Sequence, residues 1–318
     1  MKIAHISDLH LDKNHKKDNY KRTLQILEYI AANNFDHVII TGDITENAEA
    51  GAFKLARNMF KKYGLLNSKK LSLVIGNHDI YGGVHLAEDV INFPNKCKAT
   101  DYEKKIEEFG TFFNEAFDNT IRPIKHNLYP FIKEFDNFVL IGLNSIAKYS
   151  VFKNPFASNG EISDKQLDVL TKILKENRFR NKHKIIITHH HFCKDVLEEE
   201  NSSSALWQVI ERQTMKLRSK KRIIKRFKKL GVDLVLHGHL HKTTAYHRKH
   251  IKFINAGGSV LGKNNELTIN VINITKDEIK NEFVTIPFDG TSSSQPKGLN
   301  LPKIAYQKAL LESEICLN

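Results

Sequence analysis

The sequence predicts an α/β protein in which short parallel strands alternate with helices. Residues 17–33 and 49–62 have apolar side chains at helical spacing. They separate three short apolar runs that have the length and composition of buried strands, at residues 1–6, 38–41 and 71–75. A strand–helix–strand order places the strands parallel in one sheet, so their carboxyl ends meet at the same edge.

Five of the predicted strands end in segments rich in Asp, Asn and His. In chain order these segments are Asp8-Leu9-His10, Gly42-Asp43, Gly76-Asn77-His78-Asp79, His189-His190-His191 and Gly238-His239-Leu240-His241. Side chains two residues apart in a strand point to the same face, so Asp8 and His10 would lie side by side. Carboxylate, imidazole and amide groups without thiolates suit divalent ions such as Mn²⁺, Fe²⁺ or Zn²⁺. The sequence therefore predicts a metal site along this edge of the sheet.

The second half of the chain predicts further strands and one clear helix. Ser163-Asp164-Lys165-Gln166 is typical of a capping box, which would open a helix that reaches residue 178. Strand-like runs follow one another through the rest of this half, at residues 128–134, 138–144, 184–188, 232–236, 243–248, 251–256, 266–274 and 279–286.

We expect one domain over residues 1–288, interrupted by a helical insert at 80–127. Residues 289–318 read as a polar linker and a short C-terminal helix. Within the insert, aromatic and aliphatic side chains recur at helical spacing, at Tyr102, Ile106, Phe109, Phe113 and Phe117. This stripe is typical of a helix face packed on a core, and a lid over a substrate is the alternative.

Composition and charge narrow the class of protein. The chain has 318 residues, 41% of them hydrophobic, and a formal net charge of +13, which favours anionic partners. No apolar run is long enough for a transmembrane helix, and the N-terminus has no signal-peptide pattern. The three cysteines are scattered and form no disulfide framework. We expect a cytoplasmic protein, and peripheral contact with the inner face of a membrane remains an alternative.

The five segments, in this order, resemble the motifs of the calcineurin-like metallophosphoesterase superfamily. The pattern D-x-H, G-D, G-N-H-D, H and G-H-x-H is complete from Asp8 to His241. The resemblance implies a four-layer αββα sandwich, in which two mixed sheets are flanked by helices. The strand-like runs after His241 would then suit the second sheet. It also implies a centre of two divalent ions, Mn²⁺ or Fe²⁺ before Zn²⁺.

The resemblance assigns roles to individual side chains. It assigns seven of them to the two ions, with Asp8, His10 and His241 on the first, Asn77, His189 and His239 on the second, and Asp43 bridging both. The implied reaction is attack on phosphorus by a hydroxide held between the ions, which makes Asp43 part of the catalytic machinery. His78 would stabilise the transition state or protonate the leaving oxygen.

Two assignments near the ligands stay open. The family ligand follows its strand directly, which favours His189, and His190 would then point to the other side and line the pocket or be solvated. We therefore take His190, Asn77 and His78 as candidate substrate contacts. Asp79 would either orient His78 or begin the next loop.

A strongly basic segment allows two interpretations. Residues 216–229 hold nine Lys or Arg and no acid, and Leu206, Ile210, Leu217 and Ile224 share one helical face, with Phe227 at its margin. The segment is either an outer-layer helix with a solvated basic face or a basic amphipathic helix. In the second case residues 204–230 would lie on an anionic membrane or collect an anionic substrate.

We expect a metal-dependent phosphoesterase that cleaves phosphodiester or pyrophosphate bonds of a phosphorylated anionic substrate. The compact motif set resembles cyclic-nucleotide phosphodiesterases. The basic segment and the aromatic insert would fit a UDP-2,3-diacylglucosamine pyrophosphatase at the membrane surface. The positive charge would fit a nuclease, but too few residues follow His241 for the capping domain of the recombination nucleases. A non-catalytic metal-binding scaffold is the last alternative, and the complete ligand set argues against it.

Overall fold

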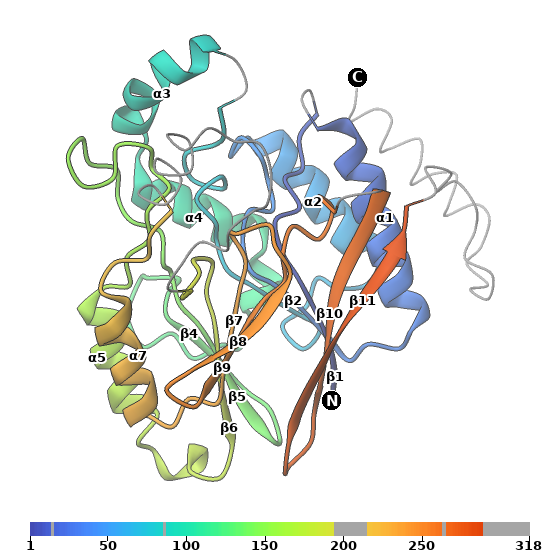
Figure 1. Cartoon of the computed structure of the whole chain (residues 1–318), viewed down its shortest axis with the longest axis vertical. Helices are drawn as coiled ribbons and strands as arrows, with labels where there is room; N and C mark the ends of the chain where they lie inside the picture. Colours follow the sequence, from blue (N-terminus) through green and yellow to red (C-terminus); the bar gives the residue numbers. More distant parts are fainter. Residues whose placement is uncertain (14–15, 85–86, 194–214, 263–264, 289–318) are drawn as a thin grey trace.

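The computed structural model describes residues 1–13, 16–84, 87–193, 215–262 and 265–288 (Figure 1). The predicted linker and C-terminal helix at 289–318 lie outside these residues. The described residues form an α/β sandwich of two mixed sheets flanked by helices, as the sequence predicts. None of their helices has both the length and the apolar character needed to cross a bilayer.

The first sheet is built on the predicted strand–helix–strand core. Its strands lie in the order β11 (Ile279–Pro287), β10 (Glu266–Ile274), β1 (Lys2–Ile6), β2 (His37–Ile40) and β3 (Leu71–Leu73). β1, β2 and β3 are parallel, and β10 and β11 are antiparallel additions beside β1. Helices α1 (Lys17–Ala32) and α2 (Ala50–Lys62) connect the parallel strands.

The second sheet continues the same arrangement. Its order is β4 (Phe131–Glu134), β5 (Phe138–Gly142), β6 (His183–Ile187), β7 (Leu234–His237), β9 (Ile251–Asn255) and β8 (Thr244–Arg248). β5, β6, β7 and β9 are parallel, and β4 and β8 are antiparallel edges. Helices α5 (Asp164–Ile173) and α7 (Lys220–Lys229) flank this sheet, on the side opposite α1 and α2 (Figure 1).

The strands after His241 differ from the expectation. All four were expected in the second sheet, but only β8 and β9 join it, whereas β10 and β11 complete the first sheet. β10 pairs antiparallel with β1 over four residue pairs. A strand pattern alone gives no partner, so the sequence could not distinguish these two destinations.

Alternate residues of the second sheet face two different cores. In β6, Ile185 and Ile187 belong to the core cluster shared with the first sheet, and Ile186 belongs to the cluster beneath α5 and α7. The period of two, which the pleat of a strand imposes, continues into the loop beyond the strand. His189, two residues after Ile187, is therefore directed towards the space between the sheets.

The segment after β3 contains α3 (Ala87–Ala99), α4 (Tyr102–Phe112) and the short 3₁₀ helix η1 (Asn114–Phe117). Phe109 and Phe113 are fully buried in the core cluster, where both contact Phe53 of α2 edge-on. Phe117 packs on Phe131 of β4. The aromatic stripe thus forms part of the core, which is the first of its two interpretations.

The capping box at Ser163 is half formed. The Ser163 hydroxyl accepts the N–H of Gln166, and α5 begins as predicted, but it ends at Ile173 instead of residue 178. The amide group of Gln166 does not return to Ser163. It bonds both the N–H and the carbonyl of Asn144, which joins the start of α5 to the end of β5.

The basic segment forms an outer-layer helix in its second half. The apolar side chains of α7, Ile223, Ile224 and Phe227, are buried in the second core cluster. Leu217 is buried too, but it precedes α7, so its predicted place on the helical face was wrong. Phe227 was expected at the margin of that face, and it is instead fully buried. Arg222 and Arg226 pair with carboxylates of α5 on the surface. Residues 204–214 of the predicted helix lie outside the described residues.

Truncating Phe113 measures how firmly α4 and η1 are held. Phe113→Ala should cost about 3–5 kcal/mol of unfolding free energy, because it leaves a cavity among buried aromatic rings. Phe152→Ala, at a side chain 96% exposed, is the control and should change stability by less than about 0.5 kcal/mol. Urea unfolding followed by circular dichroism gives both values. A loss below about 1 kcal/mol for Phe113→Ala would indicate a segment that opens readily, as a lid would.

Candidate metal centre

Five of the seven candidate ligands have a left-handed backbone. The φ angles are 57° at Asp8, 45° at His10, 49° at Asp43, 75° at His239 and 50° at His241. This conformation costs a non-glycine residue roughly 1–2 kcal/mol and concentrates at functional sites. It turns the chain sharply after β1, β2 and β7 and directs each side chain back across the strand ends.

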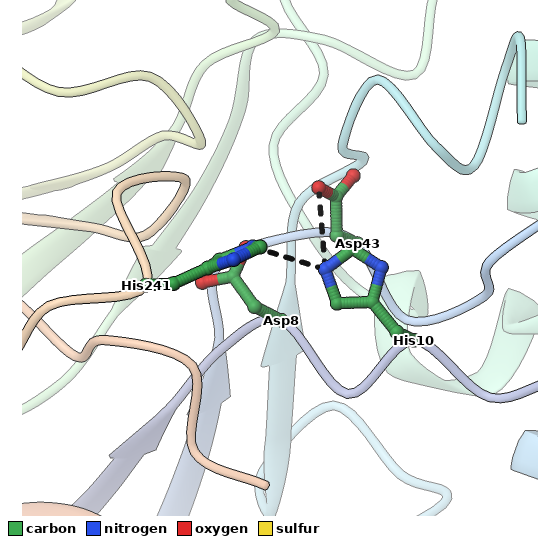
Figure 2. Close-up of side chains that lie close together, drawn as sticks. All are labelled: Asp8, His10, Asp43 and His241. Carbon is green, nitrogen blue, oxygen red and sulfur yellow. Dashed lines mark hydrogen bonds and ion pairs between the residues drawn. The ribbon is translucent and has the colours of Figure 1, made fainter. Parts of the chain in front are cut away.

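The first group of side chains joins β1, β2 and β7. Asp8, His10, Asp43 and His241 each bring one ligand atom to within 4.8 Å of the others (Figure 2). His10 Nε2 lies 3.1 Å from His241 Nε2 and 3.9 Å from Asp43 Oδ2. The Oδ1 atom of Asp8 lies 3.7 Å from His241 Nε2.

The second group contains Asp43 again, with His189 after β6 and His239 after β7. His189 Nε2 lies 3.2 Å from Asp43 Oδ2, 3.1 Å from His239 Nδ1 and 3.1 Å from Asn77 Oδ1. The structure therefore brings all seven predicted ligands together, in two groups that share the carboxylate of Asp43.

The donor and acceptor pattern of these atoms fits cations. His189 Nδ1 lies 2.8 Å from the carbonyl of Thr41 and donates to it, which leaves a lone pair on Nε2. That lone pair faces the oxygens of Asp43 and Asn77. His10 is arranged alike, because its Nδ1 lies 2.6 Å from Glu46 Oε2 and its Nε2 faces His241. Several lone pairs thus converge on one space, an arrangement that a divalent ion satisfies.

The buried carboxylates and imidazoles of the site shift one another's pKa values. Burial raises the pKa of Asp8 to about 8, an effect that His189 only partly offsets. Burial by itself would lower the pKa of His189, but the carboxylates of Asp43 and Asp8 raise it to about 9. Against the effect of burial, the neighbouring histidines hold the pKa of Asp43 well below its usual range, so this carboxylate is ionised and stabilises positive charge beside it.

The hydrogen bonds of His189 and His190 distinguish these two candidate ligands. His190 is fully buried, its Nδ1 lies 3.0 Å from the hydroxyl of Ser145, and its Nε2 lies 3.0 Å from the carbonyl of Ser158. Both ring nitrogens are therefore engaged, and none is left for a metal ion or a substrate. Among the two candidates for the ligand, this geometry favours His189.

His78 lies at the rim of the site. Its ring stands edge-on to His10 at 4.7 Å, and its side chain is 24% exposed. Its backbone N–H donates to Asp43 Oδ1, and its Nδ1 lies 3.2 Å from the carbonyl of Glu46. With Nδ1 donating to that carbonyl, Nε2 is the nitrogen available to a bound substrate.

Asp79 fixes two ligand loops relative to one another. Its buried carboxylate accepts the backbone N–H groups of Ile44, Thr45 and Gly76, together with the hydroxyl of Thr45. These contacts join the loop of Asp43 to the loop of Asn77. The hydrogen bonds of Asp79 go to these loops and not to the ring of His78, so Asp79 clamps the two loops together.

Sequence reasoning missed Glu46. Its buried carboxylate contacts His10 Nδ1 at 2.6 Å and Lys16 Nζ at 2.9 Å, and it lies 3.7 Å from His78 Nδ1. A carboxylate behind a ligating imidazole fixes the tautomer and orientation of the ring. The available signal was an acid only three residues after Asp43, in the segment that follows β2.

The glycines of the ligand motifs are required by close approach. A Cβ on Gly76 would collide with the backbone and carboxylate of Asp43, and one on Gly42 would collide with the ring of His189. Gly42 also has a φ of +96°. Glycine is required at these two positions by more than the turn itself, because no side chain fits between the loops.

The comparisons with known proteins agree with this geometry. The family model of the calcineurin-like phosphoesterases matches residues 1–243. No curated protein matches the sequence. Among solved structures, the chain is similar to a dimetal phosphatase from Danio rerio, with a TM-score of 0.58 and 11% identity over 91% of this chain and 99% of that one.

A second solved structure shows the same fold in a longer chain. The purple acid phosphatase PPD1 from Lupinus luteus has a TM-score of 0.50 and 13% identity, over 89% of this chain and 51% of that one. The family match covers both groups of candidate ligands, from Asp8 to His241. The chain therefore belongs to the calcineurin-like phosphoesterase family, and it is a metal-dependent phosphoesterase.

Proposed function

We propose that the protein hydrolyses phosphodiester bonds at a dinuclear metal centre. The ligands would be those that the sequence indicates, Asp8, His10 and His241 for one ion, Asn77, His189 and His239 for the other, and Asp43 for both. The observation that carries the proposal is the position of Asp43 in both groups of converging acceptors. One carboxylate shared by two groups is the arrangement of two-metal hydrolases.

The donor set bears on the identity of the ions. Imidazole nitrogens, carboxylates and one amide oxygen suit Mn²⁺ or Fe²⁺, with Zn²⁺ as the alternative. When bound, such ions supply a water molecule that ionises near neutral pH and positive charge for the phosphate oxygens. The chain itself orients the imidazole rings. The carbonyl of Thr41 holds Nδ1 of His189 and the carboxylate of Glu46 holds Nδ1 of His10, so Nε2 of each ring faces the site.

His78 is the proposed proton donor. It is partly exposed at the rim, and the carbonyl of Glu46 holds its Nδ1, so that Nε2 points away from this anchor. A protonated Nε2 there would donate to the oxygen that leaves phosphorus, and the same group would hold the substrate before reaction. Asn77 lies beside it and would contact a phosphate oxygen.

Among substrate classes, we propose a small diester of the cyclic-nucleotide type. The compact motif set supports it. A UDP-2,3-diacylglucosamine-type pyrophosphatase at a membrane surface is the second candidate, because exposed apolar side chains gather on one loop beside the site. A nuclease is less favoured, since the basic helix α7 lies against α5 and uses two of its arginines there.

Metal analysis tests the bridging role of Asp43. Elemental analysis of protein equilibrated with Mn²⁺ should approach about two ions per chain, and Asp43→Asn should hold fewer than about one and lose activity. Asp136→Asn, an exposed acid in the turn after β4, is the matched control and should keep both ions. A single ion in the unaltered protein at excess Mn²⁺ would contradict the dinuclear centre.

Replacing His78 separates catalysis from metal binding. His78→Ala should keep the metal content and lower kcat about 10²–10⁴-fold, because a positioned acid is removed while the ligands stay. The exposed His126 provides the control, and His126→Ala should leave kcat unchanged. Loss of an ion from His78→Ala would make the residue a ligand and refute this assignment.

A substrate panel distinguishes the candidate functions. With Mn²⁺ added, we expect turnover of bis-p-nitrophenyl phosphate and of cyclic AMP. Faster cleavage of UDP-diacylglucosamine would select the pyrophosphatase, and faster cleavage of single-stranded DNA the nuclease. Absence of turnover on all four, with the metals shown to be bound, would favour a scaffold.

A further inference from the structure

The loop between β5 and α5 presents apolar side chains to solvent. We call residues 147–160 the Phe152 loop. Phe152 is 96% exposed, the highest value among the large hydrophobic residues described, and Val151 and Phe156 are 62% and 49% exposed. The loop projects from the left side of the molecule in Figure 1, between α3 and α5. Neighbouring apolar side chains displayed in this way mark an interaction site.

The Phe152 loop is held rigidly at its base. The buried Asn154 donates its side-chain N–H to the carbonyl of Ala147 at 3.1 Å and accepts the N–H of Asn159 at 2.9 Å. The side chain of Asn159 donates to the carbonyl of Lys153. The tip is therefore displayed by a folded scaffold, so little of its backbone has to be ordered when it binds.

The same loop is built against the metal centre. The carbonyl of Ser158 lies 3.0 Å from His190 Nε2, and a Cβ on Gly160 would collide with the ring of His190. The hydroxyl of Tyr81, which follows the Asn77 loop, bonds the carbonyl of Ala147 and the N–H of Tyr149. A surface that binds the tip is thereby held at a fixed position relative to the ligands.

Basic side chains outnumber acids along the Phe152 loop and the segment that pairs with its base. Four basic side chains belong to the loop or to the segment that pairs with Gly160, namely Lys148, Lys153, Lys216 and Arg218. Two acids lie beside them, because Lys148 pairs with Glu103 and Arg218 lies 3.7 Å from Glu161. The remaining positive charge complements an anionic surface.

We propose that the Phe152 loop binds the interface of an anionic phospholipid bilayer, with Phe152 and Val151 inserted among the lipids. A protein partner would need roughly 800 Å² on this side, whereas one aromatic side chain supplies about 150–250 Å² and only three apolar residues are displayed. A small apolar wedge beside lysines and arginines suits a bilayer interface. This partner is independent of the proposed substrate.

The helix α7 can contribute charge to the proposed membrane contact but no apolar side chains. Its apolar side chains are already buried against the second sheet, so it has no free apolar face to insert. Its exposed lysines, Lys221 and Lys225 among them, can add only charge. Within the described residues, insertion therefore falls to the Phe152 loop.

Vesicle sedimentation with the full chain tests the proposal. Protein should pellet with phosphatidylcholine vesicles that contain about one third phosphatidylglycerol, and much less with phosphatidylcholine alone. Binding should weaken at about 1 M salt, where the Debye length is about 3 Å. Val151→Ser combined with Phe152→Ser should reduce the partition coefficient about tenfold or more. Phe283→Ser, 37% exposed on β11, is the matched control and should bind normally.

A tryptophan reporter locates the contact. In a Trp207→Phe background, Phe152→Trp should shift its emission to the blue when anionic vesicles are added. No pelleting of the unaltered protein, equal pelleting of the double variant or an unshifted reporter would each overturn the proposal. A dimer that the double substitution dissociates without vesicles would also overturn it, in favour of self-association. Turnover of a soluble diester should be equal in all variants. A negative result for membrane binding can therefore be told apart from a negative result for phosphodiesterase activity.

Discussion

The buried carboxylate of Asp43 lies where two groups of electron-pair donors meet, and the arrangement of the site follows from it. One group comes from the ends of β1, β2 and β7, and the other joins β2 to the ends of β6 and β7. Such a concentration of acceptors is unfavourable without cations. The rings are held in place on their far side, where His189 Nδ1 donates to the carbonyl of Thr41 and His10 Nδ1 contacts the carboxylate of Glu46. The two sheets supply opposite halves of the centre, so the sandwich must be assembled before the site exists.

The sequence predicted the parts of the fold that depend on local pattern. The apolar runs and the helices between β1, β2 and β3 follow from periodicity, and the convergence of the candidate ligands at the strand ends follows from the family motif. The partners of β10 and β11 did not follow, because an alternating strand can pair with any free edge. Gly160 and Ser158 likewise gave no sign that they would pack on His190, since that contact spans about thirty residues and depends on the folded loop.

Side chains that support the ligands were the hardest to foresee. Glu46 lies in the chain only three residues from Asp43, yet its contact is with His10, which belongs to another strand. The choice between His189 and His190 could be argued from alternation, and the hydrogen bonds of His190 to Ser145 and Ser158 now give it a physical basis. The predicted apolar face of α7 included Ile224 but left out Ile223. Both side chains are buried, because two neighbouring residues share the buried face of the helix.

The left-handed backbone at five candidate ligands sets a limit on how the sequence of this protein can change. Glycine would relieve the strain at Asp8, His10, Asp43, His239 or His241, and would at the same moment delete the side chain for which the turn exists. Gains in thermal stability must therefore come from other parts of the chain, because at these positions stability and function oppose one another.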